Sequence, residues 1–304
     1  MMRPRITVQM CTYNRAALLA QVMAALFAQD LDPDSYEIVL VDDGSTDGSY
    51  EQVIRRLAPP CALHVVRQKN AGLSRGRNAG ILRARGELIM FMDDDVLATP
   101  GLLAAHLRFH AARPRAICRG GVINVASFDG LPPARYSWRN YSGAYFWTTN
   151  VSVPLALVRE AGGFDETFSE YGWEDLELGF RLRRMGVSSV LARDALVYHY
   201  KPPVAPAAFS GMIRQARAQA RTALVFTRKH PHWRIRVATG QTPPALWWSA
   251  VARRLGWPKV LERIAGDATG GDAAAPSSAL GRWAAARLAR AAYYDELARA
   301  DRET

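Results

Sequence analysis

Apolar and polar residues follow two alternating patterns along residues 5–113. Short apolar runs that read as strands cover residues 5–11, 37–41, 62–66 and 87–92. Apolar residues at helical spacing mark residues 15–29, 49–57, 74–84 and 99–113. The runs at 37–41 and 87–92 are continuously apolar, which is typical of strands buried on both faces. Strands alternating with helices predict an α/β fold, with a mostly parallel sheet covered on both sides.

Polar residues gather just after each predicted strand. They lie at residues 12–14, 42–49, 67–80 and 93–95. In parallel α/β sheets, ligands bind outside the carboxyl ends of the strands. Because four polar loops should meet at one edge of the sheet, the sequence predicts a single site there.

Three consecutive carboxylates, Asp93, Asp94 and Asp95, end the fourth strand. Like charges this close resist ionisation unless a cation compensates them, and no Lys or Arg is adjacent in the sequence. Neither a G-x-G-x-x-G loop after the first strand nor a Walker loop is present to hold phosphates. Mg²⁺ or Mn²⁺ prefers carboxylate oxygens and bridges to diphosphate, so the triplet predicts a metal site.

The composition is that of an ordinary globular protein, with 49% apolar and 22% charged residues. The cysteines, Cys11, Cys61 and Cys118, are odd in number and not at metal-ligand spacing, which argues against a disulfide framework. We therefore expect a reduced, cytoplasmic location. Neither a signal peptide nor a membrane-spanning helix is expected, because no apolar run approaches the roughly 20 residues that a span requires.

Positive charge is concentrated in the last third of the chain. Residues 1–204 carry 23 Lys and Arg against 21 Asp and Glu, whereas residues 205–304 carry 16 against 7. This shift and the proline-rich residues 201–208 predict a boundary near residue 204. We expect one domain over 1–204, followed by a helical basic region over 205–304.

The basic region predicts three helices, over residues 209–233, 245–257 and 280–300. Basic amphipathic helices that carry tryptophan bind anionic membrane surfaces peripherally. The same helices also fit packing against the preceding domain with their arginines outward. Nucleic-acid binding is a third interpretation, but no recognition motif supports it, so no nucleic-acid partner is expected.

Four motifs occur in a fixed order: VDDGSTDGS at 41–49, NAGLSRGRNAG at 70–80, MDDDV at 92–96 and GWEDLELGFRL at 172–182. Together they resemble family-2 glycosyltransferases with the Rossmann-like GT-A fold, over about residues 5–200. The resemblance implies that the domain over 1–204 is catalytic, with a nucleotide-sugar-binding part (1–97) and an acceptor part (98–204). The resemblance implies a nucleotide-sugar donor, with UDP or another nucleoside diphosphate, a metal on a D-x-D motif, and inversion at the anomeric carbon. It also implies a hydroxyl acceptor on a glycan or lipid-linked acceptor, in polysaccharide or cell-envelope synthesis.

The resemblance assigns donor-binding roles residue by residue. Asp43 matches the contact to the donor base, Arg77 the arginine near the diphosphate, and Asp94 the residue facing the ribose or sugar. The full implied donor set is Thr12, Tyr13, Asn14, Arg15, Asp43, Asn70, Arg77, Asp93 and Asp94.

Metal ligation is assigned to Asp95, the last residue of the D-x-D match. His199 is a second candidate ligand, because related enzymes often place a histidine late in the domain. A purely structural histidine is the alternative interpretation. Oxygen ligands joined by one imidazole would favour Mn²⁺ over Mg²⁺.

An inverting transfer needs a base that takes the proton of the acceptor hydroxyl. The resemblance assigns this role to Asp175, with Glu174 as its neighbour or as an acceptor contact. The alternative is that both carboxylates only complement the dipole at the start of a helix, which is worth about 0.3–1 kcal/mol.

Aromatic residues are dense over residues 136–150. Stacking on a sugar acceptor and covering one face of a sheet both fit Trp138, Tyr141, Tyr145 and Trp147. The acceptor contacts that we expect are Trp147, Asn150 and Trp173. Two rival functions remain at this point: a nucleotidyltransferase on a similar sheet, and a non-catalytic basic protein that binds nucleic acid or membrane.

Overall fold

The structure, a computed structural model, describes every residue except 1–2, 141–142, 203–207, 268–278 and 301–304. Its contacts divide the chain into two compact units. The first unit contains Met1–Ser169 and Glu174–Lys201, and the second contains Glu170–Trp173 and Pro202–Thr304. The short segment Glu170–Trp173 therefore belongs with the C-terminal helices, although the first unit flanks it in the sequence.

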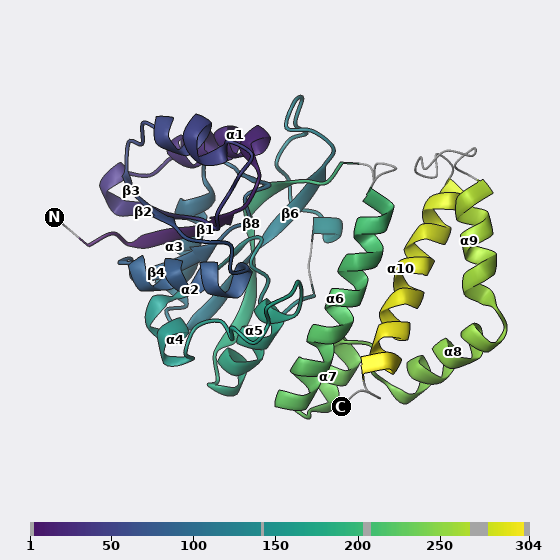
Figure 1. Ribbon diagram of the computed structural model, residues 1–304. Helices are drawn as coiled ribbons and strands as arrows, with labels where there is room; N and C mark the ends of the chain where they lie inside the picture. The colour runs from purple at the N-terminus through teal and green to yellow at the C-terminus, as the bar shows by residue number, and fades with distance from the viewer. Residues whose placement is uncertain (1–2, 141–142, 203–207, 268–278, 301–304) are drawn as a thin grey trace. The chain divides into compact units, whose positions relative to one another are not determined.

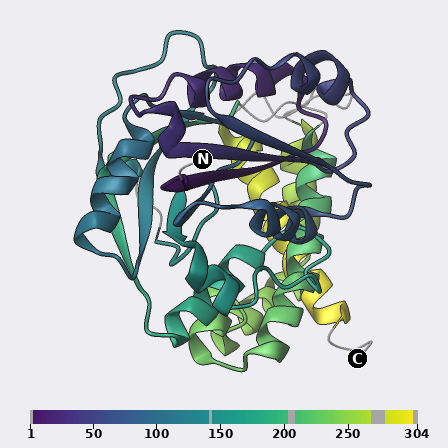
Figure 2. The ribbon, with the colours of Figure 1, turned by 90° about the vertical axis from the view of Figure 1, so that its left-hand side faces the viewer.

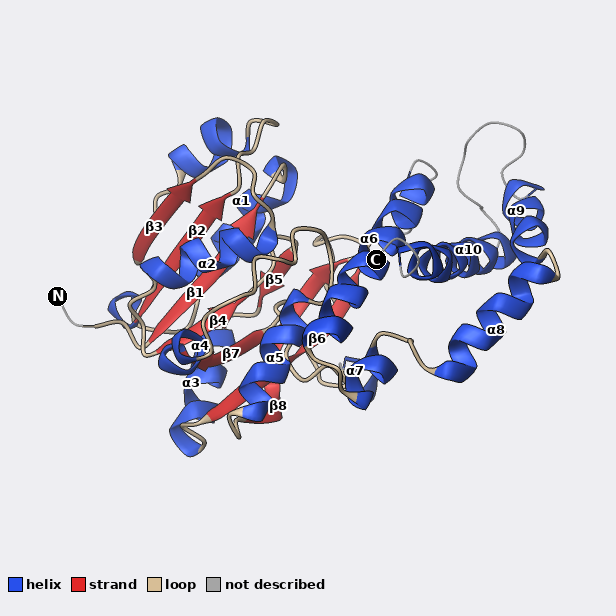
Figure 3. Cartoon of the chain, turned by 60° about the horizontal axis from the view of Figure 1, so that its bottom comes forward, coloured by secondary structure: helices blue, strands red, loops and turns tan. Residues whose placement is uncertain are grey.

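The first unit is built on one eight-stranded sheet with the order β3-β2-β1-β4-β7-β6-β8-β5 (Figure 3). The pairs β3–β2, β2–β1, β1–β4 and β6–β8 are parallel, whereas β7 is antiparallel to β4 and β6, and β5 is antiparallel to β8. The strands are β1 (Ile6–Thr12), β2 (Tyr36–Asp42), β3 (Ala62–Arg67), β4 (Leu88–Phe91), β5 (Val96–Ala98), β6 (Ala116–Val125), β7 (Val151–Pro154) and β8 (Ser188–Tyr200). The predicted α/β class with a mostly parallel sheet is confirmed.

Helices cover both faces of this sheet (Figure 2). They are α1 (Ala16–Phe27), α2 (Leu73–Arg83), α3 (Leu102–Ala112), α4 (Leu155–Glu160) and α5 (Glu174–Arg184), with short turns η1 (Pro33–Ser35) and η4 (Trp138–Asn140). Met90 packs into the core on one face, and its neighbours Ile89 and Phe91 pack into the core on the other. Side chains alternate between faces along a strand, so the continuous apolar run of β4 is explained by burial on both sides.

The prediction of a regular α-helix over residues 49–57 is wrong. The chain instead forms a π turn, η2 (Ser49–Val53), followed by a 3₁₀ turn, η3 (Ile54–Arg56). It enters the π turn from Gly48 at φ +89° and meets Pro59 and Pro60 soon afterwards. A segment this short, bounded by a left-handed glycine and prolines, has no room for several regular α-helical turns.

The second unit is helical. Its helices are α6 (Ala208–Lys229), α7 (Trp233–Ala238), α8 (Pro243–Arg254), α9 (Trp257–Asp267) and α10 (Ala279–Ala300). In Figure 1, α6 and α10 run side by side, and Ala220, Ala223 and Leu224 meet Tyr294 and Leu297 between them. Small residues on α6 let the two helices approach closely. No helix in the described part of the chain is long and apolar enough to cross a membrane.

A buried polar chain links α3 to the strand β7 of the first unit. The side-chain amide of Asn150 donates to the carbonyls of Gly121 and Ala195, so its oxygen faces His106 Nε2 at 3.0 Å. His106 Nδ1 and His110 Nε2 lie 2.7 Å and 2.8 Å from Ser152 Oγ. Burial lowers the pKa of each histidine to about 4.

These histidines should make the protein sensitive to acid. Unfolded histidines have a pKa near 6.5, so between pH 6.5 and 5.5 they take up protons that the buried ones do not. Stability is therefore lost as the pH falls, by about 1 kcal/mol for each histidine over that interval. The buried carboxyls of Asp94 and Asp175, whose pKa values are raised to about 7, act in the opposite direction.

The test is therefore a comparison between the parent and His110→Gln, in which glutamine can still donate to Ser152 but cannot titrate. Urea unfolding at the two pH values should show a smaller acid-induced loss in the variant, by about 1 kcal/mol. An equal loss in both proteins would contradict the role of His110.

Candidate active site

The loops after β1 and β2 are held together by hydrogen bonds. The Asn14 N–H donates to Ser45 Oγ at 3.0 Å, and the Thr46 N–H donates to Asn14 Oδ1 at 2.8 Å. Asn14 adopts φ +55°, a left-handed conformation that asparagine tolerates better than most residues. Thr12 is buried at the strand end, whereas Tyr13 is 47% exposed. An exposed aromatic face at this edge is thus available to a ligand.

Asp43 holds the loop that follows β3. Its carboxylate accepts hydrogen bonds from Gln68 Nε2 at 2.7 Å and from the N–H groups of Ala71 and Gly72 at 3.0 Å. A carboxylate offers about four acceptor positions, so one remains for a ligand. Asn70, in the same loop, is exposed. The three loops that carry the predicted donor residues are therefore tied into one assembly.

The acidic triplet has a cation beside it that the sequence did not reveal. Arg15 Nε lies 3.5 Å from Asp94 Oδ1, and Arg15 Nη2 lies 3.4 Å from Asp95 Oδ2. Burial nevertheless raises the pKa of Asp94 to about 7, although Arg15 opposes the shift. Burial and the charge of Asp93 also raise the pKa of Asp95. The absence of a neighbouring Lys or Arg in the sequence was therefore misleading, because the compensating arginine comes from the start of α1.

A buried ion cluster joins the triplet to α5. Arg77 Nη1 donates to Glu174 Oε1 at 2.8 Å, and Arg77 Nη2 donates to Thr148 Oγ1 at 2.8 Å and lies 3.5 Å from Asp93 Oδ1. Thr149 Oγ1 donates to Asp93 Oδ2 at 2.8 Å. We call these five residues the Arg77 cluster. Arg77 and Glu174 are buried, so the arginine predicted to lie near the diphosphate has protein carboxylates as its neighbours.

Asp95 and His199 face each other, with 3.6 Å between Oδ1 and Nε2. The antiparallel pairing of β5 with β8 brings them together, because Val96 is in register with His199. His199 Nδ1 lies 3.1 Å from Asn124 Oδ1, an acceptor, so Nδ1 carries the proton. The other ring nitrogen, Nε2, faces the carboxylate of Asp95, an arrangement that a shared cation would satisfy.

The carboxylate of Asp95 and the imidazole of His199 therefore fit a divalent metal whose remaining ligands come from a bound substrate and water. Among the described residues no group of three or more His, Cys, Asp and Glu side chains could hold a metal. Mg²⁺ in phosphate-transfer sites is commonly held by only one or two carboxylates together with substrate phosphates and water. A pair of protein ligands at the edge of the sheet is compatible with that kind of site.

Asp175 lies in the first turn of α5 and is partly buried. Burial and the neighbouring charge of Glu174 raise its pKa to about 7, and the positive charge of Arg77 opposes the shift. Just before the helix the chain turns through two left-handed residues, Gly172 at φ +110° and Trp173 at φ +73°. A positive φ is unusual for tryptophan, and strained backbone of this kind is common at functional sites. A carboxyl with a pKa near neutrality is suited to general-base chemistry.

The three predicted acceptor residues differ in burial and in the unit to which they belong. Asn150 is only 2% exposed and its amide is engaged inside the protein, which corrects the expected direct contact with an acceptor. Trp173 Nε1 donates to the Gln219 carbonyl at 2.8 Å and belongs to the second unit. Trp147 packs partly buried against the core of the first unit.

The other aromatic residues of 136–150 do not share one role, neither stacking on a sugar acceptor nor covering a face of the sheet. Trp138 is largely exposed. The Tyr145 hydroxyl donates to the Val187 carbonyl, and Arg183 lies over its ring at 5.0 Å, so this tyrosine has a structural role. Tyr141 lies outside the described residues.

Thr148, Thr149 and Asn124 contribute to the site but were not predicted. The two threonines directly precede Asn150, so their position in the sequence was a usable signal. Nothing local to Asn124 indicates that it orients His199, because that contact depends on the parallel pairing of β6 with β8.

Known proteins resemble this chain in sequence. A family model described as glycosyl transferase family 2 matches residues 7–154. The validoxylamine A glucosyltransferase of Streptomyces hygroscopicus subsp. limoneus is 30% identical, over 63% of this chain and 51% of that protein. The chondroitin synthase of Escherichia coli is 26% identical, over 63% of this chain and 34% of that protein. The chain spans about half the length, or less, of these relatives.

Solved structures share the fold. The mannosyltransferase PcManGT from Pyrobaculum calidifontis, in complex with GDP-Man and Mn²⁺, has a TM-score of 0.62 and 23% identity, covering 98% of this chain and 86% of that one. S. aureus TarS 1–349, in complex with UDP-GlcNAc, has a TM-score of 0.57 and 17% identity, covering 96% and 89%. Residues 7–154 therefore match glycosyl transferase family 2, and the chain shares the GT-A fold of these solved structures.

Proposed function

We propose that this protein transfers a sugar from a nucleotide-sugar donor to a hydroxyl group of an acceptor, with inversion at the anomeric carbon. One observation carries the proposal: the Arg77 cluster connects the acidic triplet, where a donor diphosphate would lie, to the helix that starts with Glu174 and Asp175. The match to glycosyl transferase family 2 supports the reaction class, and the similar proteins include a glucosyltransferase and a polysaccharide synthase.

The donor would bind along the loops that follow β1, β2 and β3. Asp43 has one acceptor position left for an N–H group of the base, and the exposed ring of Tyr13 offers a stacking face. Structures that share the fold contain either UDP-GlcNAc or GDP-Man, which supports a nucleotide-sugar donor without selecting the base. UDP-sugars and other NDP-sugars therefore belong in the same screen.

Asp95 and His199 would hold a divalent cation, Mn²⁺ or Mg²⁺. Bound there, such an ion supplies charge that stabilises the departing diphosphate. Arg15 would add positive charge at the same place, because its guanidinium already lies beside Asp94 and Asp95. The His199–Asn124 hydrogen bond would keep Nε2 directed at the ion.

Asp175 would act as the general base. Its carboxylate takes the proton of the acceptor hydroxyl as that oxygen forms a bond to the anomeric carbon. The bond from that carbon to the phosphate oxygen breaks, and the nucleoside diphosphate leaves with the electron pair. Glu174, held by Arg77, positions the start of α5 and contributes the negative charge that raises the pKa of Asp175.

A glycan or lipid-linked acceptor is the class that we propose, in polysaccharide or cell-envelope synthesis. The names of two relatives, a chondroitin synthase and a hyaluronan synthase, support polysaccharide as the product class. Trp147 and Trp173 remain the proposed aromatic contacts. The three free cysteines support a reducing compartment, and hence the cytoplasm.

Donor binding should depend on the metal through Asp95. Asp95→Asn keeps the size of the side chain but removes a ligand charge, so nucleoside-diphosphate affinity should fall about tenfold or more with Mn²⁺ present and change little with EDTA. Calorimetric titration measures both conditions. The exposed Asp129→Asn is the matched control and should bind like the parent. Equal affinity of the parent with Mn²⁺ and with EDTA would rule the metal role out.

The released product tests the reaction class itself. A glycosyltransferase releases nucleoside diphosphate, whereas a nucleotidyltransferase releases pyrophosphate, and coupled assays distinguish the two. A screen of nucleotide sugars by thermal stabilisation with Mn²⁺ comes first, because a ligand that binds only the folded state raises the melting temperature. No stabilisation by any donor, together with salt-sensitive binding of polyanions, would support a non-catalytic basic protein instead.

A further inference from the structure

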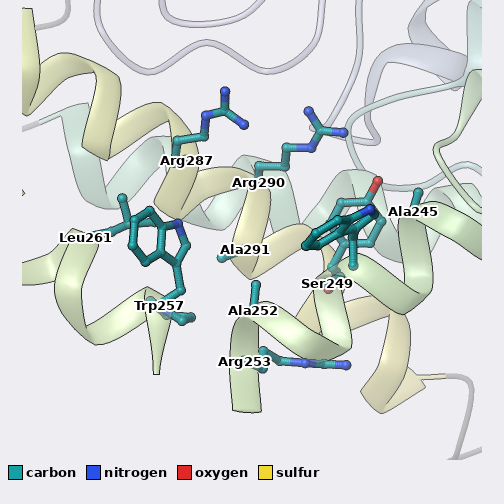
Figure 4. Close-up of a pocket in the computed structure, with 12 residues that line it drawn as sticks. Ala245, Ser249, Ala252, Arg253, Trp257, Leu261, Arg287, Arg290 and Ala291 are labelled. Carbon is teal, nitrogen blue, oxygen red and sulfur yellow. The ribbon is translucent and has the colours of Figure 1, made fainter. Parts of the chain in front are cut away.

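The second unit contains a pocket of about 360 Å³ formed by α8, α9 and α10 (Figure 4). Its walls are mainly apolar and aromatic, and three arginines join them. The lining residues used below are Trp248, Arg253, Trp257, Leu261, Arg287 and Arg290. In Figure 4, Arg287 and Arg290 extend in the same direction from neighbouring turns of α10, while Trp257 and Leu261 come from α9.

Two of these arginines have no carboxylate partner among the residues that the structure describes. Arg253 Nη1 lies 3.1 Å from Asp295 Oδ1, so its charge is partly compensated. Arg287 and Arg290 lie only over aromatic rings, those of Trp283 and Tyr294, and no acidic group of the described residues pairs with either. Both side chains are exposed. Unpaired guanidinium groups beside an apolar pocket favour a ligand that combines an anion with an apolar part.

Large apolar side chains are exposed on the helices that form the pocket and at the end of α8. Trp248 is 64% exposed and Leu255 is 77% exposed, and Trp247, Trp257 and Trp283 are also exposed. Soluble proteins seldom leave this many large apolar side chains exposed in one region without a partner. Tryptophan is enriched where a protein meets the boundary between lipid and water, because its ring is apolar and its N–H is polar.

We propose that this face of α8, α9 and α10 docks on an anionic phospholipid bilayer. The phosphate of a headgroup binds Arg287 and Arg290, and Trp248 and Trp257 enter the interface with the adjoining acyl region. An anionic bilayer is favoured by the positive charge of this region, since residues 205–304 carry 16 basic against 7 acidic residues. The same surplus opposes docking of a second copy, because the two faces would repel each other. Exposed leucines favour lipid over nucleic acid.

The experiment is sedimentation of the full chain with sucrose-loaded vesicles. Vesicles of phosphatidylcholine alone are compared with vesicles that also contain phosphatidylglycerol, at low and high salt. We expect binding only to the anionic vesicles, and weaker binding at high salt. Arg287→Gln with Arg290→Gln should reduce partitioning by about 30-fold, the effect of losing two arginines at the surface. Trp248→Ala should reduce it at least several-fold.

Matched controls separate this site from general attraction by a basic protein. Arg234→Gln with Arg236→Gln removes the same charge from exposed positions on α7, outside the pocket. Trp233→Ala removes a tryptophan that is also 64% exposed and also lies on α7. Both controls should bind like the parent. Circular dichroism melts verify that every variant is folded.

Three results would overturn the proposal. Equal losses in the pocket and control arginine variants would mean that only net charge matters. Equal binding to neutral and anionic vesicles would show that the net negative charge of the bilayer is not recognised. Self-association of the parent in analytical ultracentrifugation that Trp248→Ala abolishes would identify a second copy as the occupant. Each result is independent of sugar transfer, which is assayed with a soluble acceptor.

Discussion

Asp175→Asn should lower the turnover of sugar transfer by about a hundredfold or more while leaving donor affinity within a few fold. Asparagine keeps the size of the side chain and part of its hydrogen bonding but cannot accept the proton of the acceptor hydroxyl. General-base assistance typically contributes about 10²–10⁴-fold. Calorimetric donor binding beside a transfer assay separates the two effects.

The pH dependence has a definite sign. Burial raises the pKa of Asp175 to about 7, and only the ionised carboxylate acts as a base. Turnover in the parent should therefore fall as the pH drops below about 7 and level off above it. Glu174 raises that pKa through its charge, so Glu174→Gln should move the half-maximal pH downward with a smaller loss of turnover.

Stability provides the control for folding. A carboxyl whose pKa is raised in the folded protein destabilises it at pH values where the group is ionised. Asp175→Asn should therefore melt no lower than the parent at pH 8. If Asp175→Asn keeps near-parental turnover, or if Glu174→Gln is the inactive variant, the base is not Asp175.

Arg77→Met should lower the free energy of unfolding by about 3–5 kcal/mol. The guanidinium is buried between Glu174 at 2.8 Å and Asp93 at 3.5 Å, and its removal leaves both carboxylates without that partner. Removing one member of a buried ion pair typically costs this much, because the remaining charge stays desolvated. Urea denaturation with several probes measures the change.

Arg75→Met is the matched control on the same helix. Arg75 is exposed and lies 3.2 Å from the exposed Glu166, a surface pair worth at most about 1 kcal/mol.

Arg77→Lys keeps the charge but not the planar group that contacts Glu174 and Thr148 together, and its stability should be intermediate. Arg77→Met should also move the half-maximal pH of turnover upward, opposite to Glu174→Gln, because Arg77 lowers the pKa of Asp175. A stability within about 1 kcal/mol of the parent would show that the Arg77 cluster is not a buried ion network.

The sequence by itself determined the local elements and the edge of the sheet at which the polar loops end. Burial imposes a period on apolar residues, so the strands β1, β2, β3 and β4 and the helices α1 and α2 were predictable, whereas the helix expected over residues 49–57 was not a regular α-helix. The polar loops had to follow the strands. The acidic triplet was visible for the same reason, because charge at the end of a buried strand is conspicuous. The excess of basic residues after residue 204 also needed no structure.

Only the tertiary structure decided which of these groups meet. Arg77 and Glu174 are 97 residues apart and Arg15 and Asp95 are 80 apart, yet each pair is in contact. His199 reaches Asp95 through the β5–β8 pairing, and the sequence carries no local mark of that register. Asn150 is buried and Trp173 belongs to the second unit for the same kind of reason. Apolar periodicity reports which residues are covered, but the partner of a polar group depends on strand order and register, which are set by the packing of the whole chain.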